Sequence, residues 1–247
     1  MKGLNEFKIA FEQLLRFRLP LDSQKEEEEP TDYSLVPQLM PIVGLLTGIA
    51  LYLAAFIILF LINNRGIAAV VAAAGIPLLQ WWMYKGRNYT ALHSLLINWQ
   101  HHSESDTSET VPEKAYWTLT AFNIIIFLKI LAIGIIVFFN FQLWLLIAPL
   151  LGATVYAEFM VQESREENSE KHIPVHWLIA SVVTLLIAGW QNKLIAGLFV
   201  LVLAWLAAPY FNNAIAGKSQ CKDETRFRAV MEIVEVTVLW IGLLALQ

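Results

Sequence analysis

The sequence has few charged residues, a single cysteine and no concentrated basic tract. Only 15% of its 247 residues are charged, against about a quarter in ordinary soluble domains. Without a basic tract, nucleic-acid binding has no electrostatic footprint, and no nucleic-acid partner is expected. One cysteine, Cys221, excludes an intramolecular disulfide framework and a Cys-rich metal site. The absence of GxxxxGK[ST], GxSxG and HExxH motifs removes several common enzyme mechanisms.

Long apolar runs are what the chain has instead, and 57% of its residues are hydrophobic. A helix needs about 20 apolar residues to cross the hydrocarbon core of a membrane. The runs therefore predict an all-α, polytopic transmembrane bundle of about seven spans, with the lipid bilayer as its surroundings. Segment 1–38 is predicted to hold a cytoplasmic amphipathic helix and an acidic linker, and 39–247 to form a single membrane domain. The predicted spans are 39–62, 66–84, 117–139, 142–161, 173–190, 194–211 and 229–246.

The positions of lysine and arginine predict the orientation of these spans. Arg65 and Lys193 lie in loops on one side, and Lys129 lies inside the third span. The remaining 14 of the 17 basic residues lie in the amino-terminal segment and in the alternate loops 85–116, 162–172 and 212–228. Cytoplasmic loops carry the excess of basic residues in membrane proteins. We therefore expect the amino terminus in the cytoplasm and the carboxy terminus outside.

Two segments outside the spans have the pattern of amphipathic helices. Leu4–Phe17 repeats apolar residues at helical spacing, which fits a helix in the membrane interface or one packed on the end of the bundle. In the longest polar loop, Leu92, Leu95, Leu96 and Trp99 form a second apolar stripe. The polar side of that helix either lines a cytoplasmic cavity or simply meets water.

Three charged residues fall inside predicted spans. Glu232 and Glu235 lie three residues apart on one helical face, and Lys129 lies near the middle of the third span. Ionisable groups at membrane depth are costly and usually face the bundle interior or a polar cavity. The glutamates are therefore candidates for a site, or they reach the interface and pair with Arg226 or Arg228. Lys129 needs a partner or a wet crevice, which the sequence does not identify.

Four stretches, in order along the chain, carry a family resemblance. They are Arg18-Leu19-Pro20-Leu21 (family pattern TRLP), Met40–Gly48 (FPLVGLLLG), the lysine-containing Phe127–Leu131, and Met231–Glu235 (xELxE). Together they resemble the cobalamin synthase family, also called adenosylcobinamide-GDP ribazoletransferase. Its members are polytopic enzymes of similar length, so the resemblance spans nearly the whole chain.

The resemblance implies a function in cobalamin biosynthesis, in the cytoplasmic (inner) membrane of a prokaryote. The family joins α-ribazole to adenosylcobinamide-GDP and releases GMP, so it implies a nucleotide-activated corrinoid as ligand and Mg²⁺ as cofactor. A homo-oligomer or a membrane partner protein is also compatible with it. Carried over to this chain, the implied catalytic residues are Glu232, Glu235 and His93. The implied substrate-binding residues are Asn98, Gln100, Lys129 and Arg226, and Asp223 and Glu224, together with the two glutamates, would hold the metal.

The chain departs from the family at its acidic helix, HLDGLADTxDG. The three family aspartates fall on His93, Ile97 and Gln100, so the aspartate motif is not retained. Magnesium prefers hard oxygen ligands, and an isoleucine and a glutamine do not supply the negative charge that phosphoryl transfer needs. A non-catalytic membrane paralogue that acts as a scaffold or partner subunit is the alternative. Small-molecule transport is a third interpretation, which the absence of paired broken helices makes less favourable.

Overall fold

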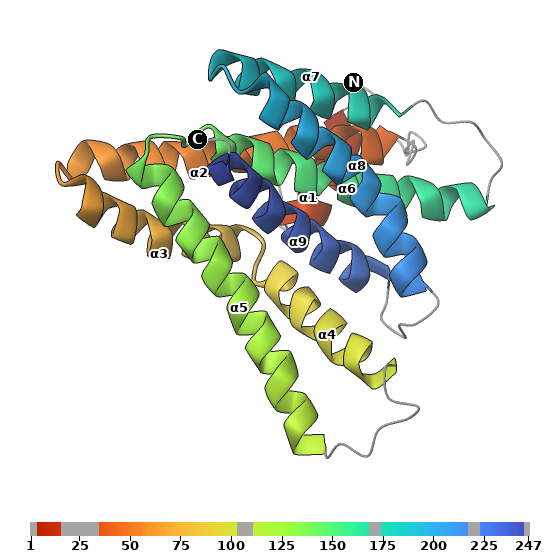
Figure 1. Ribbon diagram of the computed structural model, residues 1–247. Coiled ribbons are helices and arrows are strands. Elements are labelled where there is room, and N and C mark those ends of the chain that lie inside the picture. The colour runs from red at the N-terminus through yellow and green to blue at the C-terminus, as the bar shows by residue number, and fades with distance from the viewer. Residues whose placement is uncertain (1–3, 16–34, 103–110, 168–173, 217–222, 245–247) are drawn as a thin grey trace, which may run out of the picture.

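The protein is a bundle of helices in a computed structural model that describes residues 4–15, 35–102, 111–167, 174–216 and 223–244. Every regular element in these ranges is an α-helix, which confirms the predicted all-α fold class. The acidic linker predicted within 1–38 lies outside the described residues. Figure 1 shows the helices, which are α1 (Leu4–Leu15), α2 (Val36–Leu61), α3 (Arg65–Met83), α4 (Arg87–His102), α5 (Val111–Phe138), α6 (Trp144–Glu167), α7 (Val175–Trp190), α8 (Leu194–Ala216) and α9 (Asp223–Leu244).

Four of these helices are long and apolar enough to cross a membrane. They are α2, α3, the Tyr116–Phe138 part of α5 and the Trp144–Gln162 part of α6. The helix α7 and the Leu194–Ala207 part of α8 are also apolar but shorter. By length and composition the chain is therefore a multi-pass membrane protein. That α7, α8 and α9 also cross the membrane stays a prediction.

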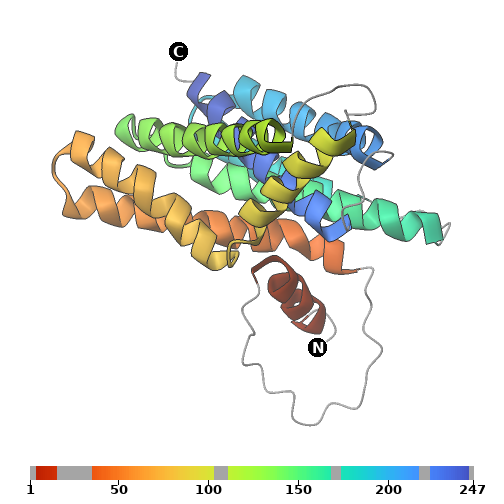
Figure 2. The ribbon, with the colours of Figure 1, turned by 90° about the horizontal axis from the view of Figure 1, so that it is seen from below.

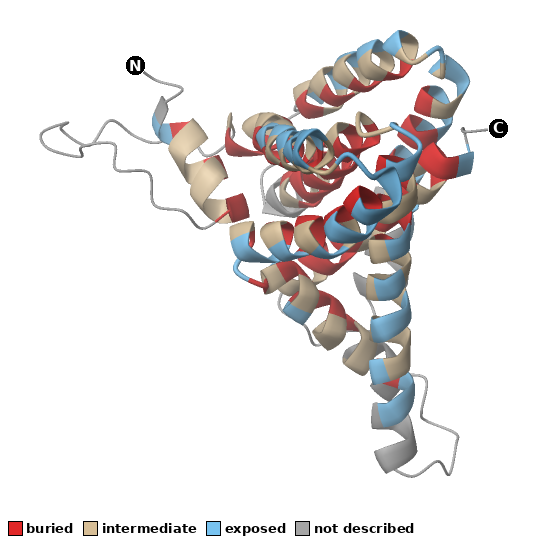
Figure 3. Ribbon diagram, turned by 90° about the vertical axis from the view of Figure 1, so that its left-hand side faces the viewer, coloured by how far each residue is buried: buried red, intermediate tan, exposed pale blue. Residues whose placement is uncertain are grey.

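The central helix of the bundle is α6. Of the residues in its apolar span 83% are buried, compared with 28–39% in the other three spans. It packs against α2 and α9, and also against α7 and α8. A helix that is apolar all round suits such a position, and Figure 3 shows the buried residues gathered where the helices face one another. The core of the protein is therefore built around α6.

The backbones of α2 and α6 approach each other closely. A Cβ atom on Gly44 would lie 2.5 Å from the carbonyl oxygen of Pro149 and 2.6 Å from Cβ of Ala153. One turn later, a Cβ atom on Gly48 would lie 2.7 Å from Cα of Leu146. Small residues at GxxxG spacing allow membrane helices to approach in this way. The stretch Met40–Gly48, which carries the family resemblance, thus forms the contact between α2 and the central helix.

A tight turn joins α3 to α4. Lys85 and Gly86 have φ angles of 50° and 71°, and the amide of Gly86 donates a hydrogen bond of 2.8 Å to the carbonyl of Trp81. A Cβ atom on Gly86 would lie 2.7 Å from Nε1 of Trp81, so both the conformation and the space favour glycine. The turn starts α4 at Arg87, directly after α3. From there α4 packs along α9 and α5.

The amino-terminal helix α1 lies against the end of the bundle and contacts α2 (Figure 2). Ala10, Leu14 and Leu15 on its apolar face are buried. Arg228 of α9 donates hydrogen bonds to the carbonyl oxygens of Gln13 and Leu14, at the end of α1. A guanidinium at this position satisfies carbonyls that have no partner inside the helix. Of the two interpretations of this segment, the structure favours a helix packed on the bundle.

Candidate functional site

A buried cluster of three charged side chains joins α5 to α9. Nζ of Lys129 lies 2.5 Å from Oε1 of Glu232 and 2.9 Å from Oε2 of Glu235. Each of the three side chains is only 1–2% exposed. The lysine without an identified partner and the two unexplained glutamates therefore satisfy one another. The alternative pairing with Arg226 or Arg228 is not the one that the structure shows.

Two side chains of α3, together with a glycine of α6, position Glu235. Nε2 of Gln80 donates a hydrogen bond of 2.5 Å to Oε2 of Glu235, and the hydroxyl of Tyr84 lies 3.5 Å from Oε1. On the other side, a Cβ atom on Gly152 of α6 would lie only 2.9 Å from Cγ of Glu235. Any larger residue at position 152 would displace this glutamate. The charged cluster is thus enclosed by α3, α5, α6 and α9.

The helix α4 adds an aromatic ring to the cluster and packs a buried amide against α9. Nζ of Lys129 lies 5.7 Å from the centroid of the Tyr89 ring, a distance typical of a cation–π contact. Burial raises the pKa of the Tyr89 hydroxyl above its ordinary value, so Tyr89 stays neutral at physiological pH. Asn88 is fully buried, and its Nδ2 lies 3.9 Å from the sulfur of Met231 on α9.

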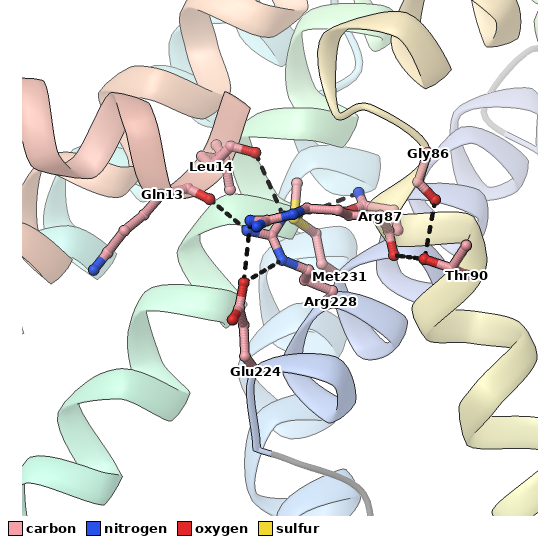
Figure 4. Close-up of polar contacts among 9 residues, drawn as sticks. Gln13, Leu14, Gly86, Arg87, Thr90, Glu224, Arg228 and Met231 are labelled. Atoms are coloured by element: carbon pink, nitrogen blue, oxygen red, sulfur yellow. Dashed lines mark hydrogen bonds and ion pairs between the residues drawn. The ribbon is translucent and has the colours of Figure 1, made fainter. Parts of the chain in front are cut away.

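A polar pocket of about 190 Å³ lies where α4 and α9 begin. Figure 4 shows its ion pairs: Nη1 of Arg87 lies 3.3 Å, and Nε of Arg228 3.1 Å, from Oε1 of Glu224. Arg228 is almost entirely buried, whereas the Glu224 side chain is 57% exposed. The residues that line the pocket are Arg87, Thr90, Ala91, Ser94, Glu224, Thr225 and Arg228.

The composition of this pocket suits an anionic group. Two guanidinium groups, on Arg87 and Arg228, face one carboxylate, on Glu224, so the lining carries one excess positive charge. Thr90, Ser94 and Thr225 add hydroxyl groups. Guanidinium groups bind phosphate and carboxylate oxygens through paired hydrogen bonds. The volume is sufficient for a group of the size of a phosphate.

Of the other predicted site residues, two contact aromatic rings and three lie outside the description. His93 packs edge to face on Phe122 of α5, with ring centroids 5.6 Å apart. The guanidinium of Arg226 lies 5.3 Å from the centroid of the Phe227 ring. No described contact joins His93 or Arg226 to Glu232 or Glu235. The predicted residues whose side chains lie outside the described part of the structure are Asn98, Gln100 and Asp223.

Three of the four carboxylates that the resemblance assigns to a metal are already engaged by basic side chains, and the fourth, on Asp223, lies outside the described side chains. Glu232 and Glu235 bind Lys129, and Glu224 binds two arginines. In the described ranges, no three His, Cys, Asp or Glu side chains come together as a metal-binding group. Magnesium takes hard oxygen ligands that carry negative charge. The described donor set does not fit a magnesium cage, and no metal-dependent step follows from it.

A second buried polar cluster joins α6 to α7. Oε2 of Glu158 accepts a hydrogen bond of 2.9 Å from Nε1 of Trp177 and lies 2.9 Å from Nε2 of His176. Nε2 of Gln162 donates to the other carboxylate oxygen at 3.0 Å. His176 itself is buried. These contacts attach α7 to the central helix.

Sequence reasoning missed several residues of the cluster and the pocket. Gln80 had a signal, since it is a polar residue inside an apolar run, the same feature that singled out Lys129. No such signal in the sequence marks Tyr89, Arg87 or Thr225, because a single sequence does not show that the start of α4 lies beside the start of α9. The family resemblance gains no support from elsewhere: no protein-family model, no curated protein and no solved structure matches this chain.

Proposed function

We propose that this chain is a membrane protein of the cobalamin synthase type that acts as a non-catalytic paralogue and binds an anionic ligand at its cytoplasmic face. The observation that carries the proposal is the pocket between α4 and α9. It presents Arg87 and Arg228 against a single carboxylate, where a metal-dependent transferase would need a cluster of acids. In this pocket, guanidinium groups rather than a metal ion neutralise the negative charge of the ligand, but they do not activate a nucleophile.

The stretches that resemble the family support this division between scaffold and chemistry. Met40–Gly48 forms the close contact of α2 with α6, and the lysine of Phe127–Leu131 binds both glutamates of Met231–Glu235. Three of the four landmarks thus contribute residues to the packed interior. The stretch that differs from the family is α4, which lines the pocket. A retained scaffold with an altered ligand site is what a paralogue without the original chemistry would have.

The proposed topology places the pocket within reach of soluble ligands. We propose seven spans, an amino terminus in the cytoplasm and a location in the inner membrane of a prokaryote, because 14 of the 17 basic residues then lie on the cytoplasmic side. Arg87 and Arg228 are among these 14. The ligand is a phosphate-bearing molecule, and the nucleotide-activated corrinoid of the family is the first candidate.

Binding measurements test the proposal directly. Purified protein in mild detergent is titrated with inorganic phosphate and with GDP. Arg87→Gln removes a charge-assisted hydrogen bond worth about 1.5–3 kcal/mol, so affinity should fall roughly tenfold or more. Arg65→Gln is the matched control, because Arg65 starts α3, away from the pocket, and it should bind as the parent does. Equal affinity in the two variants, or no binding to the parent protein, would count against the proposal.

Genetic complementation separates the paralogue from an active transferase. The chain is expressed in a bacterium that lacks its own cobalamin synthase, and its presence in the membrane is verified. We expect growth that depends on cobinamide and ribazole precursor not to be restored. If growth is restored and Glu232→Gln abolishes it, the chain is a ribazoletransferase with a rebuilt site, and the non-catalytic interpretation is wrong.

A further inference from the structure

The buried cluster of Lys129, Glu232 and Glu235 contains more acids than bases. Both described ion pairs of the two glutamates go to the single ammonium of Lys129. With all three groups ionised, the cluster carries one net negative charge. Its side chains are 1–2% exposed, so water does not screen that charge. An uncompensated charge in such surroundings is strongly unfavourable, and one further positive charge removes it.

Oxygen atoms without a partner lie on the residues of this cluster and beside it. Oε2 of Glu232 and Oε1 of Gln80 are buried and have no described hydrogen-bond partner. The same holds for the hydroxyl oxygen of Tyr89 and for Oδ1 of Asn88. Buried polar atoms are nearly always satisfied in folded proteins. Oε2 of Glu232 and Oε1 of Gln80 belong to residues in contact within the cluster, and such oxygens beside one excess negative charge are the ligand chemistry of a small hard cation.

We infer that Glu232, Glu235 and the oxygens beside them form a binding site for one exchangeable monovalent cation, a proton or Na⁺. The net charge of the cluster determines the valence of the bound cation. One positive charge neutralises the cluster, whereas a divalent ion beside Lys129 would leave it with a net positive charge. Membrane-embedded acids with this chemistry usually belong to ion or proton paths. The inference rests on the cluster alone and does not depend on the family resemblance or on the proposed anion pocket.

The groups that face the two glutamates are known from each neighbouring helix. The contacts from α3 are Gln80 and Tyr84, and from α5 the contact is Lys129. The helix α4 contributes the ring of Tyr89, and Gly152 of α6 lies directly against Glu235. Lys129 is thus the sole cation among these contacts. Protonation or Na⁺ binding would therefore fall on the carboxylates.

The face of α9 that carries the glutamates leads to the polar pocket. Glu224, Arg228, Glu232 and Glu235 follow one another at spacings of four, four and three residues, which places them along one side of the helix. The first two line the pocket and the last two form the cluster. The pocket and the cluster therefore lie along the same side of α9, with the pocket at the start of the helix and the cluster further along it.

Reaction with dicyclohexylcarbodiimide tests the inference, because this apolar reagent labels protonated carboxyl groups in apolar surroundings. Full-length protein in proteoliposomes is labelled over a pH series, with NaCl or choline chloride, and the labelled residue is identified by mass spectrometry. We expect label on Glu232 or Glu235. Above the pKa of the site the rate should fall roughly tenfold per pH unit, as for a single titrating group. Protection by NaCl, but not by choline chloride, identifies Na⁺ as an occupant, and a pH effect alone identifies the proton.

Two variants make the experiment decisive. Glu232→Gln leaves a neutral pair of Lys129 and Glu235, so the label, and any effect of pH or Na⁺ on the melting temperature, should disappear while the protein stays folded. Glu158→Gln removes a carboxylate of α6 that contacts His176 of α7 rather than the cluster and should leave both effects unchanged. No label on Glu232 or Glu235 at any pH, or cation-dependent melting that persists in Glu232→Gln, would overturn the inference. Because these readouts use no anionic ligand, the inference and the proposed function fail separately.

Discussion

At the residue scale, the stability of the interior depends on how the charge of Lys129 is balanced. Its ammonium group is taken fully out of water and is held by two carboxylates at 2.5 and 2.9 Å. Bringing such charges into the interior costs several kcal/mol per ion, and the pairing only just offsets this. The cluster therefore adds little net stability. Removing one partner, however, leaves charge without compensation.

Lys129→Met should be strongly destabilising for this reason. It leaves Glu232 and Glu235 next to each other with no cation, and breaking a buried pair typically costs about 3–5 kcal/mol. A triple variant that adds Glu232→Gln and Glu235→Gln removes the buried charge altogether and should recover most of the lost stability. The measurement is the melting temperature of purified protein in detergent. If the triple variant is no more stable than Lys129→Met, the charge balance is not what Lys129 provides.

The sequence identified each of the three charged residues of this cluster, but not that they contact one another. Lys129, Glu232 and Glu235 stood out because ionised side chains are costly inside apolar spans. More than a hundred residues separate the lysine from the acids, and no local spacing rule connects positions so far apart. Arg228 was the nearer candidate partner in sequence, but it binds Glu224 and the end of α1. Pairing across the bundle follows from the packing of α5 on α9, which a single sequence does not contain.

At the scale of the elements, apolar runs determined the helices well. The predicted span 39–62 corresponds to α2 and the predicted span 66–84 to α3, each within three residues at either end. Such runs can be recognised as helices because, in lipid, a helix satisfies all its backbone hydrogen bonds within the segment. The sequence did not predict which helices pack against one another, because the lipid-facing and buried faces of these helices are equally apolar. That α6 is the central helix and that α2 touches it at two glycines are results of the structure.

The approach of α2 to α6 predicts a sharp difference between two glycines. In Gly48→Ala the new methyl group would lie 2.7 Å from Cα of Leu146, so the helices must separate, at a cost of about 1–3 kcal/mol. In Gly75→Ala nothing lies within 4 Å of the new methyl group, and alanine favours a helix by about 1 kcal/mol over glycine. We expect a lower melting temperature for Gly48→Ala and an unchanged or higher one for Gly75→Ala. Equal losses in both variants would contradict the close contact.

At the scale of the whole molecule, basic residues are unevenly distributed between the two ends of the bundle. The polar pocket, the start of α9 and the end of α1 are held together by Arg228. The proposed topology puts this end of the bundle in the cytoplasm, together with the loops that carry most of the basic residues. Arg65 lies at the start of α3, at the other end of that helix from the turn that leads to Arg87. Under the proposed function, the orientation decides which compartment supplies the anion.

The single cysteine makes this orientation measurable without engineering a reporter. Cys221 precedes α9 in the sequence, within the segment 212–228 that the proposed topology places in the cytoplasm. A membrane-impermeant maleimide should therefore label it in inverted inner-membrane vesicles but not in right-side-out spheroplasts. In the reverse test, Asn63→Cys in a Cys221→Ser background introduces a thiol in the exposed turn between α2 and α3, and it should react only in spheroplasts. Label on Cys221 in spheroplasts, with Asn63→Cys labelled in inverted vesicles, would reverse the orientation and place the Arg87 pocket outside the cell.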